Sequence, residues 1–238
     1  MKKAVIFDLD GTLSDSIASM KYCSDLALEP FGFGPFTIDQ YKYFVGDGAA
    51  NLIRRAIRAG ALERLREKTG GQFSPEEAQT LQEEAQEQYF EAAFARYREI
   101  FRENCMYRVK PYSGIEELLQ KLKERKVRIA VLSNKPHEET VRVIHSLFGE
   151  DCFDVIRGQM EGVAIKPSPE GVFRILEQLG LSAGEILYLG DTATDMQTGK
   201  RAGAFTVGAL WGFRERTELE QAHADAIIGY PTELLAYL

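Results

Sequence analysis

Two aspartates near the start of the chain, Asp8 and Asp10, could act together because a single residue separates them and an apolar run precedes them. That run, Ala4–Phe7, is short and does not alternate with polar residues, as is typical of a parallel strand buried on both faces. Gly11 and Thr12 follow, so backbone N–H groups could turn toward an anion there. Two unpaired carboxylates at such a strand end would repel each other unless a cation holds them or one keeps its proton.

Other polar residues stand at comparable places further along the chain. They are Ser133, Asn134, Asp191 and Asp195 near the ends of predicted strands, and Lys166 just before a predicted helix. Each alone has an ordinary reading as a turn residue, a helix cap or a surface lysine. Because ligands of open parallel sheets collect at the carboxyl ends of the strands, we expect these groups to converge. Such a set suits a phosphate group held between Mg²⁺ and a lysine.

The elements that must position these residues alternate between strand and helix in the second half of the chain. The apolar runs predict strands at 4–7, 127–132, 153–156, 186–189, 205–207 and 226–228. Between them the patterns predict helices at about 115–125, 137–147, 168–179 and 195–202, the third capped by Ser168. This order predicts an α/β fold, a doubly wound parallel sheet with right-handed crossovers and a Rossmann-like core.

Residues 15–107 interrupt this alternation. The segment is rich in Ala, Glu, Gln, Leu and Arg and shows no convincing strand pattern. Thr37–Gln40 and Ser74–Glu77 have the residue types of capping boxes, which mark helix starts. After the second box, an apolar helix face is predicted at Ala78, Leu81, Ala85, Tyr89 and Ala92. We therefore expect an all-helical domain at 15–107, inserted into an α/β core domain formed by residues 1–14 and 108–238, with hinges at the two crossings.

Composition excludes several classes of protein. The 238 residues include 29 Lys and Arg against 36 Asp and Glu, a net charge of −7 that disfavours a general nucleic-acid binder. Cys23, Cys105 and Cys152 lie far apart without a CxxC pair, which excludes a disulfide framework and a zinc ribbon. No apolar run is long enough for a secretory signal or a membrane span. We expect a cytoplasmic protein, a monomer or a homodimer, without nucleic-acid or membrane partners.

Four segments of the chain resemble, in order, the four motifs of the haloacid dehalogenase superfamily. They are Phe7–Leu13, Ser133–Lys135, Lys166–Pro167, and Gly190–Thr192 together with Asp195. The resemblance covers the whole sheet domain, and the helical insertion after the first motif is similar to the mobile caps of the phosphatase branch. Within that branch the chain most resembles phosphoglycolate phosphatases, on the segments Val45–Ala49, Arg54–Ala56 and Gly190–Arg214.

The resemblance implies a chemical role for each candidate residue. Asp8 would attack phosphorus and form an aspartyl-phosphate, while Asp10 would act as general acid and then as general base. Mg²⁺ would be held by the side chains of Asp8 and Asp191 and the backbone carbonyl of Asp10, with Asp195 ordering Lys166 or metal-bound water. The phosphate-binding residues implied in this way are Gly11, Thr12, Ser133, Asn134 and Lys166.

The leading hypothesis is therefore a Mg²⁺-dependent phosphomonoester hydrolase for a small phosphorylated metabolite, with 2-phosphoglycolate as the first candidate. Alternatives are a phosphatase for a sugar phosphate, a nucleotide or pyrophosphate, and a phosphomutase. A non-enzymatic phospho-acceptor ranks last, because receivers of that kind carry no large insertion. Asp10 favours phosphate chemistry over carbon–halogen cleavage, since the dehalogenating relatives lack a carboxylate at this position. In the insertion, the Tyr43–Gly48 loop is the candidate for reading the leaving group. Arg54, Arg55 or Arg58 could meet a substrate carboxylate, although each of them alone is more typical of a solvated helix face.

Overall fold

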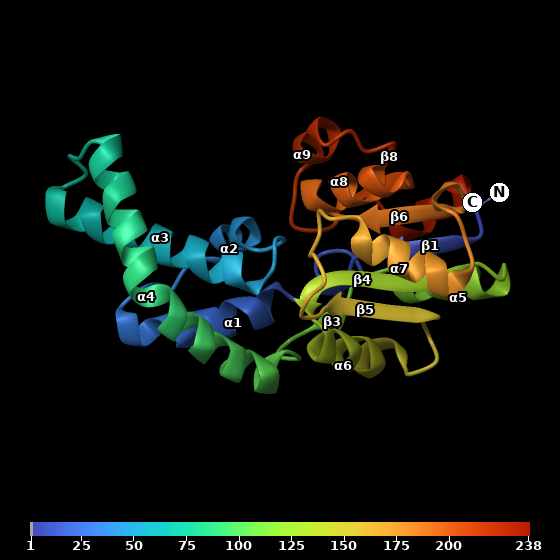
Figure 1. The fold of residues 1–238 in the computed structure, drawn as a ribbon, viewed down its shortest axis with the longest axis horizontal. Coiled ribbons are helices and arrows are strands. Elements are labelled where there is room, and N and C mark those ends of the chain that lie inside the picture. Colours follow the sequence, from blue (N-terminus) through green and yellow to red (C-terminus); the bar gives the residue numbers. More distant parts are fainter. Residues whose placement is uncertain (1) are drawn as a thin grey trace. The chain divides into compact units, whose positions relative to one another are not determined.

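A six-stranded parallel sheet organises the part of the chain that carries both termini (Figure 1). The computed structural model describes residues 2–238. The strands of the sheet are β1 (Ala4–Phe7), β4 (Arg128–Pro136), β5 (Val155–Gln159), β6 (Ile186–Gly190), β7 (Phe205–Ala209) and β8 (Ala226–Ile228). Their spatial order is β5-β4-β1-β6-β7-β8, and every neighbouring pair is parallel. The prediction of a doubly wound parallel α/β sheet is confirmed.

Helices cover both faces of this sheet. They are α5 (Ile115–Glu124), α6 (His137–Phe148), α7 (Glu170–Leu179), α8 (Ala193–Ala202) and α9 (Arg216–Gln221), with short 3₁₀ turns at Ala183–Glu185 and Pro231–Tyr237. Helix α7 begins at Glu170, one residue later than predicted, with Pro169 at its N-cap and no side chain capping it; Ser168 Oγ instead accepts a weak bond from the Glu170 N–H. Helix α8 begins earlier than predicted, because Thr192 and Asp195 form a capping box.

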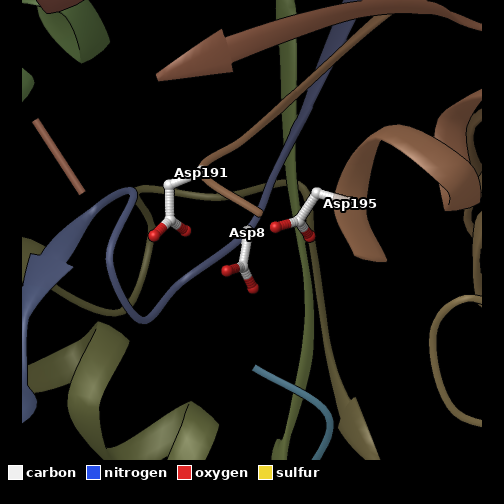
Figure 2. A group of neighbouring side chains, drawn as sticks. All are labelled: Asp8, Asp191 and Asp195. Atoms are coloured by element: carbon white, nitrogen blue, oxygen red, sulfur yellow. The ribbon is translucent and has the colours of Figure 1, made fainter. Parts of the chain in front are cut away.

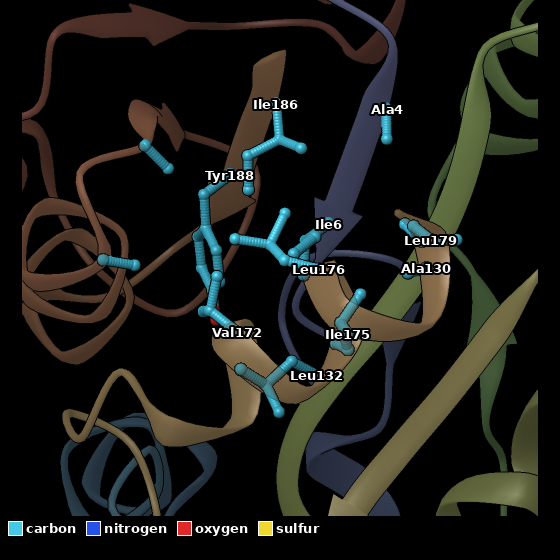
Figure 3. Packing of buried hydrophobic residues seen from close by; sticks show 12 residues of the cluster. Ala4, Ile6, Ala130, Leu132, Val172, Ile175, Leu176, Leu179, Ile186 and Tyr188 are labelled. Carbon is cyan, nitrogen blue, oxygen red and sulfur yellow. The ribbon is translucent and has the colours of Figure 1, made fainter. Parts of the chain in front are cut away.

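The core on one face of the sheet fixes the positions of the strands. Ala4 and Ile6 of β1 lie among residues of β4, β6 and α7 that are almost fully removed from solvent (Figure 3). Helix α7 contributes the side chains of Val172, Ile175, Leu176 and Leu179, a helical spacing that presents one continuous apolar stripe. Each fully buried side chain of this size contributes about 1.5–3 kcal/mol.

Alternate residues of β1 face the opposite side, as a strand requires. There Phe7 meets the ring of Phe153 edge-on, with ring centroids 6.4 Å apart, and Phe153 in turn contacts Phe148 at the end of α6. Strand β1 is therefore buried on both faces, which is why its sequence is uniformly apolar.

The chain divides into two compact units, one formed by the segment up to Ser16 with Val109–Leu238 and the other by Ile17–Arg108. The second unit is helical and contains α1 (Ile17–Leu28), a 3₁₀ turn (Glu29–Phe31), α2 (Ile38–Phe44), α3 (Ala49–Thr69) and α4 (Pro75–Asn104). Both predicted capping boxes are confirmed, at Thr37 with Gln40 and at Ser74 with Glu77. The predicted apolar face of α4 is wrong at its C-terminal end, where Ala93 is buried and Ala92 is exposed.

Two very short strands mark the points where the chain leaves the α/β unit and returns to it. Strand β2 (Ser14–Asp15) pairs antiparallel with β3 (Lys110–Pro111), and Asp15 lies opposite Lys110. The sequence did not predict this ladder. No helix within residues 2–238 combines the length and the apolar character that crossing a membrane would require.

Candidate active site

The sheet brings the predicted residues to one edge because β1 lies between β4 and β6. Phe7, the last residue of β1, is in register with Val131 of β4 and Leu189 of β6. Asp8 follows, and its backbone N–H donates to the Leu189 carbonyl at 2.9 Å, which fixes it beside β6. Asp191 comes directly after β6. Strand β4 runs four residues beyond its predicted end, so Ser133–Lys135 lie on the strand itself.

Asp8, Lys166 and Asp195 form a buried ion-pair network. The Lys166 ammonium lies 2.7 Å from Asp8 Oδ1 and 2.7 Å from Asp195 Oδ1, and the three side chains are at most 9% exposed. Asp191 joins them, and one carboxylate oxygen from each of the three aspartates lies within 4.8 Å of the other two. Figure 2 shows the three carboxylates converging from β1, β6 and α8.

This group has more negative charge than its lysine can balance. Burial raises the pKa of Asp8 well above its usual value, and repulsion by Asp195 and Asp191 adds to this against the lowering effect of Lys166. Burial, followed by repulsion from Asp195, raises the pKa of Asp191 to about 7. Burial disfavours the charged form of Lys166, but Asp195 and Asp8 together hold its pKa well above its usual value. The arrangement therefore favours a further cation.

The surroundings of Asp191 fit a divalent ion. Its two oxygens accept hydrogen bonds from Thr12 Oγ1 at 3.1 Å and from the Phe213 N–H at 2.8 Å, which fix the carboxylate. A Cβ on Gly11, whose φ is 92°, would lie 2.3 Å from Asp191 Oδ2, and one on Gly212 would lie 2.3 Å from Asp191 Cβ. Glycine at both places leaves room for the carboxylate, and buried carboxylate oxygens are the donors that Mg²⁺ prefers. The residues present thus fit Mg²⁺.

Asp195 is bound to the lysine through one oxygen and to the start of its own helix through the other. Oδ1 accepts from Lys166, and Oδ2 accepts from the hydroxyl and N–H of Thr192 at 2.7 and 3.2 Å. Asn134 holds the same lysine by its main chain, since its amide donates to the Lys166 carbonyl at 3.1 Å and accepts from the Lys166 N–H at 2.9 Å. Asp195 and Asn134 therefore fix the lysine from its two ends.

The predicted phosphate-binding groups of the β1 turn and of β4 have partners within the protein. The N–H groups of Gly11 and Thr12 donate to the carbonyls of Ser14 and Leu9 at 2.9 and 3.4 Å. Ser133 Oγ accepts from the Lys135 N–H at 3.1 Å and is itself buried. The turn is closed further by the Trp211 indole, which donates to the Thr12 carbonyl at 2.9 Å.

Asp10 belongs to a second polar group that the sequence did not predict. The Lys135 ammonium lies 2.6 Å from Asp10 Oδ1 and 2.8 Å from Oδ2, although 125 positions separate the two residues. Ser16 Oγ also donates to Asp10 Oδ1, at 2.6 Å. The Lys135 side chain is 2% exposed and that of Asp10 is 16% exposed. The one available signal was a second lysine at a strand end, directly after Ser133 and Asn134.

In the helical unit, the candidate loop Tyr43–Gly48 is held by its own neighbours. Arg55 forms an ion pair with Asp47 and donates to the Phe44 carbonyl at 3.0 Å. The Arg54 guanidinium lies over the ring of Phe90, 4.0 Å from its centroid. Arg54 and Arg55 are thus partly buried and bound to groups of their own unit, where the sequence favoured a solvated helix face.

Comparisons with known proteins point to one family. A model of the haloacid dehalogenase-like hydrolase family matches residues 5–209. A protein of Aquifex aeolicus named phosphoglycolate phosphatase is 29% identical over 233 residues, which cover 98% of this chain and 95% of the relative. One of Neisseria gonorrhoeae with the same name is 28% identical over 98% of this chain and 91% of its own. A crystal structure from Haemophilus somnus, at 22% identity, superposes with a TM-score of 0.82 over 99% of this chain and 97% of that one, which shows the shared fold.

Proposed function

Because this chain belongs to the haloacid dehalogenase-like hydrolase family, we propose that it hydrolyses a small phosphomonoester through a phosphorylated Asp8, with Mg²⁺ as cofactor. The chain is a phosphatase of this family, a phosphoric monoester hydrolase. The observation that carries the proposed mechanism is the buried convergence of three aspartates and one lysine at the end of β1.

In the first step, an Asp8 carboxylate oxygen attacks phosphorus while the bond from phosphorus to the ester oxygen breaks. The carboxyl group of Asp10 donates its proton to the departing oxygen. In the second step, Asp10 accepts a proton from a water molecule whose oxygen attacks phosphorus, and the bond from Asp8 to phosphorus breaks. Inorganic phosphate leaves, and both aspartates return to their starting states.

Mg²⁺ would be held by the side chains of Asp8 and Asp191 and the main-chain carbonyl of Asp10, and when bound it offsets the negative charge of the phosphoryl oxygens. Lys166 supplies a fixed positive charge beside the attacking carboxylate, and its two ion pairs keep it there. Ser133 offers a hydroxyl to a phosphoryl oxygen from the neighbouring strand.

The contacts make the proposed roles of four residues more specific. Asn134 and Asp195 act as positioning residues, because both hold Lys166 rather than point a spare group at substrate. Gly11 and Thr12 shape the turn after Asp8, with Gly11 giving Asp191 room and Thr12 orienting it. Such neighbours set geometry to within fractions of an ångström, which phosphoryl transfer requires.

We propose 2-phosphoglycolate as the first substrate to test, because relatives named phosphoglycolate phosphatase match nearly the full chain. The experiment is a phosphate-release panel with Mg²⁺ that ranks kcat/KM for 2-phosphoglycolate, sugar phosphates, nucleotides, pyrophosphate and p-nitrophenyl phosphate. We expect 2-phosphoglycolate to rank first. If another compound has the highest kcat/KM, that compound replaces 2-phosphoglycolate as the proposed substrate. If no compound of the panel releases phosphate, the proposal of a hydrolase is wrong.

The phosphorylated aspartate is tested separately. Acid quenching during turnover of a ³²P-labelled ester should leave label on the protein, and hydroxylamine should release it, as it does from acyl phosphates. The Asp8→Asn variant should retain no label. Label on that variant, or none on the native enzyme at any quench time in a single turnover, would rule out the phosphorylation of Asp8.

A further inference from the structure

Lys135 is a second buried lysine at the edge of the sheet that carries the reacting groups. Its ammonium lies 2.6 and 2.8 Å from the two oxygens of Asp10, and its side chain is 2% exposed. Its main chain is pinned on both sides, by Ser133 Oγ at the N–H and by Thr140 Oγ1 at the carbonyl, each at 3.1 Å. Lysines are rarely buried to this extent without a partner, and the partner here is the residue proposed to transfer the proton.

The two lysines of the site are placed for different parts of a substrate. Lys166 is bound to Asp8 and Asp195, next to the atom that attacks phosphorus. Lys135 is bound to Asp10, which in the proposed reaction touches the oxygen of the leaving group. The ammonium of Lys135 therefore marks the leaving-group side of the phosphoryl group.

Distances set what Lys135 can reach. A leaving oxygen that takes a proton from Asp10 lies about 2.7 Å from one of its oxygens. With Lys135 Nζ 2.8 Å or less from each Asp10 oxygen, the leaving oxygen is within about 5.5 Å of the ammonium. In 2-phosphoglycolate the carboxylate carbon is two bonds from that oxygen, about 2.4 Å away. The carboxylate thus falls within reach of a lysine side chain that turns about its last bonds.

Charge points the same way. Around Asp8, three carboxylates share one ammonium group, so a divalent cation would balance that side before any substrate arrives. An anionic leaving group then adds a charge that nothing on the Asp8 side can offset, since Lys166 is already shared between two carboxylates. The Lys135 ammonium lies on the side of Asp10, where that added charge would sit, and can attract it at short range.

We propose that Lys135 is a specificity-determining residue that binds an anionic group, a carboxylate, on the leaving group one carbon away from the ester oxygen. This inference rests on the proposed hydrolysis at Asp8 and adds to it the group that distinguishes carboxylated esters from neutral ones. The competing account is that Lys135 only holds Asp10 in place, and in that case it affects all esters alike.

The test compares two esters of similar size, 2-phosphoglycolate and 2-hydroxyethyl phosphate, in the native enzyme and in Lys135→Gln with Mg²⁺ present. Gln keeps a hydrogen-bond donor for Asp10 but carries no charge. We expect the native enzyme to favour 2-phosphoglycolate by at least about tenfold in kcat/KM, and the variant to lose about tenfold or more of that preference. Lys135→Arg, which keeps the charge, should retain part of it. Ser16→Ala, which removes the other donor to Asp10, serves as the matched control. It should lower kcat/KM for both esters by the same factor.

A binding measurement gives the same answer without turnover. Calorimetry with Mg²⁺ compares 3-phosphonopropionate, a carbon analogue of 2-phosphoglycolate, with the neutral-tailed n-propylphosphonate. The native protein should bind the carboxylated phosphonate at least about tenfold more tightly, and Lys135→Gln should bind both equally.

The possible failures are distinct. Parallel losses on both esters in Lys135→Gln, or equal affinities for the two phosphonates in the native protein, would overturn the role of Lys135 and leave the hydrolase intact. No phosphate release from these two esters or from any ester of the panel would overturn the proposed function, while the phosphonate pair would still decide whether Lys135 binds a carboxylate.

Discussion

The surroundings of Asp8 and of Asp10 differ sharply, although only one residue separates the two in sequence. Around Asp8, three buried carboxylates share one ammonium group, and their mutual repulsion adds to burial in raising the pKa of Asp8. Around Asp10, one carboxylate is bound by an ammonium and a hydroxyl. The first group carries excess negative charge and is suited to a metal ion, whereas the second is already balanced. The difference arises from what β4, β6 and α8 bring to each residue.

Of the substitutions that test this difference, Asp8→Asn should lower the activity most. It removes the nucleophile while keeping its shape, so we expect kcat to fall by at least about 10⁴-fold. One of the crowded carboxylates also becomes neutral, so the unfolding temperature of the metal-free protein should not decrease. Phosphate release and thermal unfolding followed by circular dichroism measure the two effects. Residual turnover above a hundredth of the native rate would contradict the assignment.

Asp10→Asn, which changes the carboxylate bound by Lys135, should lower the activity less than Asp8→Asn but still strongly. At saturating Mg²⁺ we expect kcat to fall by at least about 10²-fold for an alkyl ester, because the leaving oxygen no longer receives a proton. The loss should be smaller for p-nitrophenyl phosphate, whose phenolate leaves without help. The variant also leaves the Lys135 ammonium without its carboxylate, so the unfolding temperature should fall. Equal losses for the two esters would argue against proton donation by Asp10.

The Asp8 side was largely predictable from the sequence because its geometry follows from topology. Non-alternating apolar runs indicate buried parallel strands, and the ends of such strands meet at one edge of the sheet. That reasoning alone predicted that Asp8, Asp191 and Lys166 converge. Their partners in the network are local or adjacent in the sheet, as with Asp195 in the first turn of α8.

The Asp10 side was not predictable because it depends on side-chain direction. Lys135 reaches Asp10 only because β4 continues to Pro136, four residues past the end of its apolar run, where polar residues hid the strand. The helical unit shows a similar limit: the buried face of α4 passes through Ala93 and not Ala92, since residue spacing fixes a helix face only to within about one position. Likewise, no apolar pattern marks the two-residue strands β2 and β3.

The excess charge around Asp8 also predicts a pH-dependent response to Mg²⁺. In the metal-free protein, the pKa of Asp191 is about 7, above the value of about 3.8 expected for the unfolded chain. A pKa raised in this way stabilises the fold below pH 4, and that contribution is lost as the pH rises through 7. Mg²⁺ replaces the protons, so it should raise the unfolding temperature by several degrees at pH 8 and by much less at pH 5.5.

Scanning calorimetry with and without Mg²⁺ at the two pH values measures this effect. Asp191→Asn, which keeps the hydrogen-bonding shape but removes one charge, is the matched control and should lose most of the stabilisation at pH 8. A Mg²⁺ effect of equal size at both pH values would contradict a site built from carboxylates that are protonated in its absence.

The smallest effect on activity is expected from Ser16→Ala, which tests how much Asp10 depends on the Ser16 hydroxyl. Ser16 Oγ donates to Asp10 Oδ1 at 2.6 Å, while Lys135 continues to hold both oxygens after the change. The loss of one such hydrogen bond corresponds to about 1 kcal/mol, so we expect kcat to fall about fivefold with KM little changed. Ser14→Ala is the control, because the Ser14 hydroxyl is equally buried but donates to the Leu9 carbonyl at 3.3 Å. If both variants slowed turnover equally, the loss would come from the turn as a whole; a loss confined to Ser16→Ala would show that Asp10 needs both of its donors to stay aligned with the leaving oxygen.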